Sequence, residues 1–192
     1  MEPLHLPLTE EAGWHRISSS RLILSTLPIP LLDALIAGDR AGIRQYSPLD
    51  FRESWAAEVD FLDLRRTALL ADPDYAPWAP RAISRLADHR VIGHIGFHTR
   101  PGAAYLKETV PDGVELGYTI FEPYRGHGYA QEACLAMMRW ARAFAGVTRF
   151  VLSIGPGNAP SLAIAAKLGF RQIGEQMDEI DGLEFVFAAS LS

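Results

Sequence analysis

The stretch Phe121–Glu132, which reads FEPYRGHGYAQE, decides the fold because it joins the end of a strand, a tight turn and the start of a helix. Alternating residues run from Val114 into this stretch, and Pro123 stops the strand. Gly126 and Gly128 then punctuate a turn, after which apolar residues recur at helical spacing. We therefore predict a strand, a turn and a helix, in this order.

The predicted turn has the properties of an anion-binding site. A helix N-terminus carries N–H groups without partners and a partial positive charge, and glycine lets an anion approach these donors closely. The turn Arg125-Gly126-His127-Gly128 lies directly before the helix. Two glycines before a helix are also common in turns that bind nothing, so the stretch by itself leaves both interpretations open.

Length and composition exclude several classes of protein. The chain has 192 residues, of which 48% are hydrophobic and 21% charged. These values are typical of one globular domain that buries its core without metals or disulfides. The net charge of −5 gives no support to nonspecific nucleic-acid binding, which needs a basic face. We expect no nucleic-acid partner and no metal.

Cysteine usage and hydropathy indicate a cytoplasmic protein without a membrane partner. Cys134 is the single cysteine and cannot form an internal disulfide. It falls on the apolar face of the predicted helix, so we interpret it as a core thiol rather than a nucleophile. The most apolar segment, Leu22–Ala37, contains two prolines and an aspartate and is too short to span a bilayer. No basic-then-apolar signal opens the chain.

The order of the predicted elements indicates one α/β domain with a mixed sheet. Residues 1–20 show no clean period and are expected to form a leader, so that residues 21–192 form a single domain. The order is one strand, two helices, three strands, a helix, a strand, a helix and two strands. We find no internal repeat.

The N-terminal half begins with a strand predicted over Arg21–Leu27, and a short helix follows. A longer helix is expected over Glu53–Leu70. The proline-rich connection Asp72–Pro80 is expected to place Trp78 in the core rather than to form a lip over a substrate.

A hairpin is predicted from Arg81–Leu86 and Val91–His98. His94 and His98 are four residues apart on its second strand, which separates them by ~13 Å, so we expect no shared metal. The remaining predicted elements are a strand over Thr148–Ile154, a helix over Leu162–Leu168, and a hairpin of strands Phe170–Met177 and Leu183–Ala189 around Asp181-Gly182.

Five short motifs carry a resemblance to a known family. They are R-L-I-L from Arg21, E-L-G-Y from Glu115, R-G-H-G-Y-A from Arg125, N-A-P-S from Asn158 and K-L-G-F from Lys167. In the third motif, Arg125, Gly128 and Ala130 satisfy an acyl-CoA signature. With these motifs, the chain from about Ser20 onward resembles the Gcn5-related N-acetyltransferase (GNAT) superfamily, and within it the ribosomal-protein alanine acetyltransferase (RimJ/RimL-like) type.

The resemblance implies a mostly antiparallel sheet that is splayed at its centre and flanked by helices, with acetyl-CoA as co-substrate at the splayed strands. Backbone N–H groups of the turn would hold the pyrophosphate, and the pantetheine arm would pair with the strand before it. Asn158 and Ser161 would hydrogen-bond the cofactor, although Asn158 also suits a helix cap. The residues that the resemblance implies for cofactor binding are Tyr118, Ile120, Phe121, Arg125, Gly126, His127, Gly128, Tyr129, Ala130, Asn158 and Ser161.

The resemblance also implies direct attack of a primary amine on the acetyl thioester. Glu115 is the candidate general base, and a purely structural carboxylate is the alternative. Many family members use a tyrosine as general acid at the position that Ala165 occupies here, so this chain departs from the pattern. A thiol pKa near ~8.5 makes the thiolate a tolerable leaving group without an acid. Ser161 is a candidate for approaching the sulfur.

These inferences leave three functions open. The first is an N-acetyltransferase for a small molecule or a protein N-terminus, with a homodimer as a family-level expectation. The second is a non-catalytic acyl-CoA-binding sensor, which the alanine at position 165 motivates. The third is a tRNA-acetylating, toxin-like protein, which would need a basic surface that this acidic sequence does not show.

Overall fold

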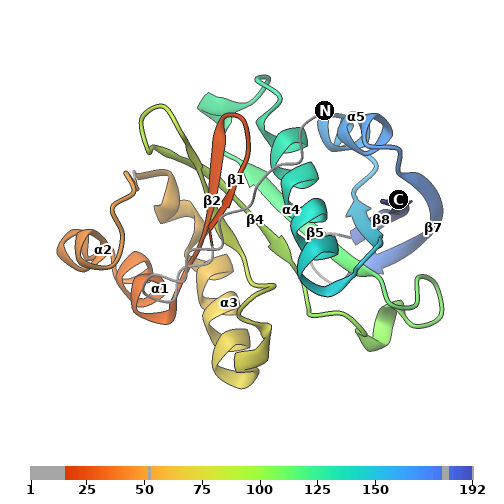
Figure 1. The fold of residues 1–192 in the computed structure, drawn as a ribbon, viewed down its shortest axis with the longest axis horizontal. Helices are drawn as coiled ribbons and strands as arrows, with labels where there is room; N and C mark the ends of the chain where they lie inside the picture. Colours follow the sequence, from red (N-terminus) through yellow and green to blue (C-terminus); the bar gives the residue numbers. More distant parts are fainter. Residues whose placement is uncertain (1–15, 52, 179–181, 192) are drawn as a thin grey trace. The chain divides into compact units, whose positions relative to one another are not determined.

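The computed structural model describes residues 16–51, 53–178 and 182–191 (Figure 1). The chain forms two compact units. The first comprises Met1–Gly96 and Tyr118–Ala133, and the second comprises Phe97–Gly117 and Cys134–Ser192. Each unit is described by itself.

The first unit contains an antiparallel set of strands. They are β1 (Arg16–Ser18), β2 (Leu22–Thr26), β3 (Arg81–Arg85) and β4 (Val91–Phe97), paired in this order. The last residue of β4, Phe97, is assigned to the second unit. The hairpin of β3 and β4 is confirmed, and His89 in its turn has a φ of 55°. β1 lies inside the segment that we expected to be a leader, and residues 1–15 lie outside the described residues.

The helices of the first unit are α1 (Ile29–Ile36), α2 (Arg40–Tyr46) and α3 (Val59–Ala71), with a 3-10 turn η1 (Glu53–Glu58) before α3. Figure 1 shows α1 and α2 next to each other. We did not predict α2. Its N-cap could nevertheless be recognised in the sequence, since the carboxylate of Asp39 accepts a 3.0 Å hydrogen bond from the N–H of Ala41, as a capping aspartate does. The connection after α3 includes the turn η2 (Pro73–Tyr75) and buries Trp78, whose exposure is 5%, as predicted.

The second unit contains the other strands. They are β5 (Val114–Ile120), β6 (Arg149–Ile154), β8 (Gly182–Ser190) and β7 (Arg171–Asp178), paired in this order. Of β5, the second unit contains the residues up to Gly117. Figure 1 shows β7 and β8 side by side. The tip of this hairpin, including Asp181, lies outside the described residues.

Only β5 and β6 pair in parallel among the described strands, and their pairing is short. It joins Val114 to Phe150 and Glu115 to Val151, and no pair is found beyond Glu115 in the described part of the chain. The two strands are therefore paired only near their N-terminal ends. The α/β class with a mixed, mostly antiparallel, centrally splayed arrangement of strands is confirmed.

A group of aromatic rings lies in the core of the second unit. Phe97, Phe150 and Trp140 of α4 (Tyr129–Ala145) are each at most 2% exposed. The ring centroids of Phe97 lie 6.4 Å from those of Trp140 and of Phe150. Such rings each bury a large apolar area, and they connect α4 with β6.

Candidate functional site

The glycine turn of the first unit forms an open hollow. Gly126 and Gly128 have φ angles of 78° and 77°, a conformation that side chains with a Cβ rarely adopt. A Cβ at Gly126 would meet no atom within 4 Å, and one at Gly128 would meet only Nη2 of Arg21, at 3.6 Å. The space above both glycines is therefore free for a ligand.

Backbone donors line this hollow. The N–H groups of Gly126, His127 and Gly128 have no acceptor among the residues that the structure describes. The first hydrogen bond of α4 runs from the N–H of Glu132 to the carbonyl of Gly128, at 3.1 Å. Consecutive free N–H groups at a helix start bind anions such as phosphate. The turn fits the diphosphate of an acyl-CoA.

Two side chains of the turn stabilise its own backbone. Nε of Arg125 donates to the carbonyl of Ile120 at 2.9 Å and so ties the turn to the end of β5. Nδ1 of His127 lies 2.7 Å from the carbonyl of Arg125, which it reaches as a donor. The ring of His127 also stacks on Tyr129, with 5.7 Å between centroids. Both side chains therefore have a structural role, whatever they contribute to a ligand.

The strand before the turn offers fewer free groups than we expected. The N–H of Phe121 donates to the carbonyl of Ile92 at 2.9 Å, and the carbonyl of Ile120 accepts from Arg125. The N–H of Phe121 is therefore already used within the first unit, whereas a carbonyl oxygen such as that of Ile120 can accept a second hydrogen bond. Pairing of a pantetheine arm with Tyr118, Ile120 and Phe121 stays a prediction.

A clamp that the sequence did not reveal holds the glycine turn from the connection between β1 and β2. Oε2 of Glu132 forms an ion pair with Nε of Arg21, at 2.7 Å. Its Oε1 accepts hydrogen bonds from the backbone N–H of Arg21 at 2.8 Å and from Oγ of Ser19 at 2.7 Å. Nη1 of Arg21 donates to the carbonyl of His127 at 3.0 Å. The guanidinium carbon lies 4.7 Å from the ring centroid of Tyr129. Arg21 thus compensates the charge of Glu132 beside the anion-binding turn.

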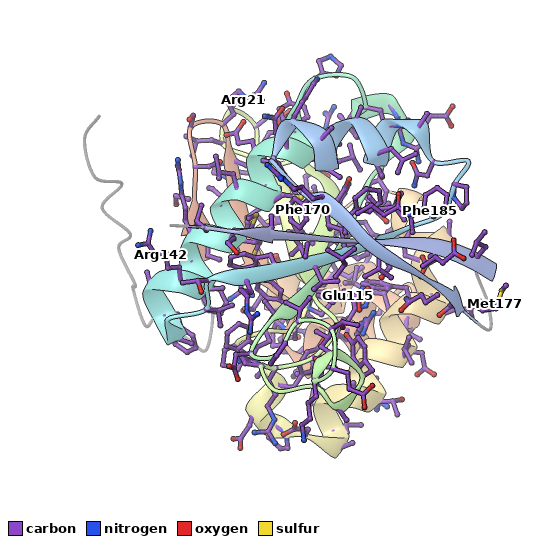
Figure 2. The ribbon with its side chains drawn as sticks, turned by 90° about the vertical axis from the view of Figure 1, so that its right-hand side faces the viewer. Arg21, Glu115, Arg142, Phe170, Met177 and Phe185 are labelled. Atoms are coloured by element: carbon purple, nitrogen blue, oxygen red, sulfur yellow. The ribbon has the colours of Figure 1, made fainter. Side chains whose placement is uncertain are left out.

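In the second unit, Glu115 (Figure 2) is the centre of a hydrogen-bonded cluster. Its side chain comes from β5 and the residue is only 4% exposed. Ser153 Oγ of β6 donates to Oε1 at 2.5 Å, and Nδ1 of His98 lies 3.5 Å from Oε2. Gln176 of β7 donates to Ser153 Oγ at 3.2 Å and to Glu184 Oε2 of β8 at 3.2 Å. Four strand segments therefore meet where β5 and β6 begin to diverge.

The cluster changes the acidity of Glu115. Burial by itself would raise its pKa, but hydrogen bonds from His98, Ser153 and Tyr105 and the charge of His98 outweigh burial and lower the pKa to about 2. A carboxylate with this pKa stays ionised at neutral pH. It is a weak base for an ammonium proton, since an α-amine has a pKa near 7.7–8.0, about six pKa units higher.

The start of α5 (Ala159–Lys167) holds the other predicted residues. Oδ1 of Asn158 accepts from the N–H of Ser161 at 3.2 Å, so the capping role of Asn158 is confirmed. The hydroxyl of Ser161 has no partner among the described residues. Ala165 is completely buried, so no side chain at this position in this chain reaches a ligand.

Other candidate centres are not supported. Cys134 is completely buried, and burial raises the pKa of its thiol, as expected of a core residue. Within the described ranges, we find no group of three or more His, Cys, Asp or Glu side chains placed to hold a metal. His94 is 5% exposed and lies 3.1 Å from Glu58, so it has a partner of its own in the first unit. No described helix has the length and apolar character needed to cross a membrane.

Two features of this chain are typical of one family. One is a glycine turn at a helix start with free backbone N–H groups, and the other is a parallel strand pair that is joined at one end only. The chain belongs to the acetyltransferase (GNAT) domain family, which matches residues 21–171. The predicted family is therefore confirmed.

Curated relatives are similar over different lengths. An uncharacterized N-acetyltransferase of Bacillus subtilis, YjdG, is 25% identical over 157 residues, which cover 80% of this chain and 88% of that protein. The human alpha/beta-tubulin-N-acetyltransferase 9 is 42% identical over 60 residues, or 31% of this chain. The chain aligns with 29% of the length of that human protein and 31% of the length of its Nematostella vectensis relative.

Solved structures share the fold. A GNAT-family acetyltransferase from Bordetella pertussis has a TM-score of 0.65 at 22% identity, with 91% of this chain and 98% of that chain covered. Mycobacterium smegmatis RimJ in complex with CoA-disulfide has a TM-score of 0.61 at 17% identity, with 92% and 86% covered. At these identities the likeness concerns the fold.

Proposed function

We propose that this protein transfers the acetyl group of acetyl-CoA to a primary amine of a small molecule or a protein N-terminus. The observation that carries the proposal is the turn at Gly126–Gly128, where backbone N–H groups without acceptors face open space at a helix start. Family membership and the RimJ structure with CoA-disulfide support acetyl-CoA as the donor. A cytoplasmic location is part of the proposal.

In the proposed reaction, the amine nitrogen attacks the acetyl carbonyl carbon, a C–N bond forms, and the C–S bond breaks. The sulfur leaves with the electron pair, and the nitrogen loses a proton. The turn would bind the diphosphate, and Arg21 would offset the negative charge of Glu132 beside it. Ser161, whose hydroxyl has no partner among the described residues, is proposed to donate a hydrogen bond to the leaving sulfur.

The pKa of the acceptor bears on its identity. At neutral pH about a tenth of an α-amine is unprotonated, whereas a lysine amine with a pKa near ~10.4 is unprotonated only about 0.04% of the time. Because Glu115 is a weak base, the site suits an amine that is already partly neutral. We therefore favour α-amines over lysine side chains.

Two measurements test the proposal. Calorimetry should show binding of CoA, and a thiol-release assay should show consumption of acetyl-CoA with peptides carrying free α-amines, faster than with N-blocked peptides that contain lysine. If acetyl-CoA binds and no amine in a broad panel releases thiol, the protein is an acyl-CoA sensor instead. If CoA does not bind, both functions are wrong.

A further inference from the structure

His98 lies beside Glu115 with one ring nitrogen engaged and the other without a partner. Its backbone N–H donates to the carbonyl of Glu115 at 2.9 Å, which aligns the two residues across adjacent strands. Its Nδ1 is 3.5 Å from Oε2 of Glu115. Because the carboxylate is ionised and can only accept, Nδ1 carries the proton of the neutral ring. Nε2 then presents a lone pair.

The free nitrogen lies over Gly117, the next residue on the same face of β5. A Cβ at Gly117 would come within 2.6 Å of Nε2, so only glycine leaves room for the ring in this position. Glu115 makes the last parallel pair with β6, and Gly117 lies past it, where the strands have diverged. Nε2 therefore lies over β5 beyond its last pair with β6, where the proposed acetyl transfer would place the thioester.

The ring is also accessible. The side chain of His98 is 40% exposed, whereas that of Glu115 is 5% exposed. No described residue bonds to Nε2. A substrate can therefore reach His98 directly, but it can reach the carboxylate only by displacing the groups that already bond to it.

We infer that His98 Nε2 accepts the proton of the attacking amine and that Glu115 is a positioning residue that holds Nδ1. This inference rests on the proposed acetyl transfer. The proton moves from the amine nitrogen to Nε2 as the C–N bond forms, giving an imidazolium paired with the Glu115 carboxylate. Water then takes this proton, and the released thiolate takes one from water, so the products are the amide and CoA thiol. A carboxylate that orients a histidine in this way is a known catalytic arrangement.

The groups that face His98 define its pH dependence. They are Glu115 of β5, Tyr105 of the turn η3 (Ala104–Leu106), which hydrogen-bonds Glu115, and Glu184 of β8, which connects through Gln176. All are within the second unit. Glu115 is the charged group in direct contact, so its removal should change the pH profile of kcat more than removal of Glu184 does.

The decisive variant is His98→Asn, with His89→Asn as a matched control. His89 is an exposed histidine of the β3–β4 turn, and asparagine tolerates its positive φ. We expect His98→Asn to lower kcat about 100-fold, as for loss of a general base, with the affinity for CoA unchanged. The acid limb of the pH profile of kcat should disappear, and added imidazole should restore part of the rate. His89→Asn should match the wild-type protein.

A second measurement does not depend on turnover. Imidazole ¹⁵N NMR of the wild-type protein should show the proton of His98 on Nδ1, and Glu115→Gln should lose this preference. Glu115→Gln should also shift the acid limb without abolishing it. The inference is overturned if His98→Asn keeps wild-type kcat and its acid limb, or if His98 carries its proton on Nε2. Absence of thiol release by the wild-type protein would overturn the proposed function itself, and the inference with it.

Discussion

Replacing Gly128 by valine should weaken CoA binding by about 10- to 100-fold. Gly128 has a φ of 77°, and an L-residue in this region is strained by ~1–2 kcal/mol. A Cβ here would lie 3.6 Å from Nη2 of Arg21, and the two methyl groups of valine would fill the hollow that faces the free N–H groups. A hydrogen bond to a charged group contributes about 1.5–3 kcal/mol, and each 1.4 kcal/mol is about tenfold in affinity. Loss of one such bond therefore gives the lower limit.

Gly146→Val separates backbone strain from ligand binding. Gly146 follows the C-terminus of the same helix, has a φ of 69°, and has open space around its Cβ position. Both variants should lower the melting temperature by a few degrees, but only Gly128→Val should change the dissociation constant of CoA measured by calorimetry. If Gly128→Val binds CoA within about twofold of the wild-type protein, the diphosphate lies elsewhere and the assignment of the turn is wrong.

Three further predictions concern other parts of the chain. Arg21→Gln should raise the dissociation constant of CoA about tenfold, because it leaves the carboxylate of Glu132 uncompensated beside the turn. Adding Glu132→Gln should recover part of the lost affinity. The control Arg139→Gln, on the exposed side of α4, should leave the dissociation constant unchanged. The pKa of Glu115 is lowered from 4.5 to about 2 on folding, so its ionisation contributes stability that is complete above the unfolded pKa and is lost as pH falls through the folded pKa. Urea unfolding should show that the free energy of unfolding falls by about 3 kcal/mol between about pH 5 and pH 2, and that Glu115→Gln lacks this loss. The same dependence of the free energy of unfolding on pH in both proteins would contradict the pairing. Trp78→Ala should lower the free energy of unfolding by about 3–5 kcal/mol, because Trp78 is buried; a loss below about 1 kcal/mol would mean that the proline-rich connection is not part of the core.

Most elements could be predicted from the sequence because their signals are local. Gly126 and Gly128 with Pro123 placed the turn and the start of α4, and the alternation after Arg90 placed β4. The helix α2 was missed because it has seven residues, too few for a periodic pattern, and only its cap at Asp39 marked it. The strand β1 has three residues and owes its conformation to pairing with β2.

The sequence by itself determined the family and the position of the glycine turn that we propose to bind the diphosphate, since both depend on residues close together in the chain. Only the tertiary structure decided how charges are compensated and which side chains surround Glu115. Arg21 and Glu132 are 111 positions apart, and Ser153 is 38 positions from Glu115. The sequence motif around position 115 is the same whether the carboxylate is exposed or buried. The hydrogen-bond donors that surround it in the fold outweigh its burial and lower its pKa to about 2. Hydrogen bonds and desolvation depend on distances in space, so the transfer of the role of base from Glu115 to His98 could be inferred only from the fold.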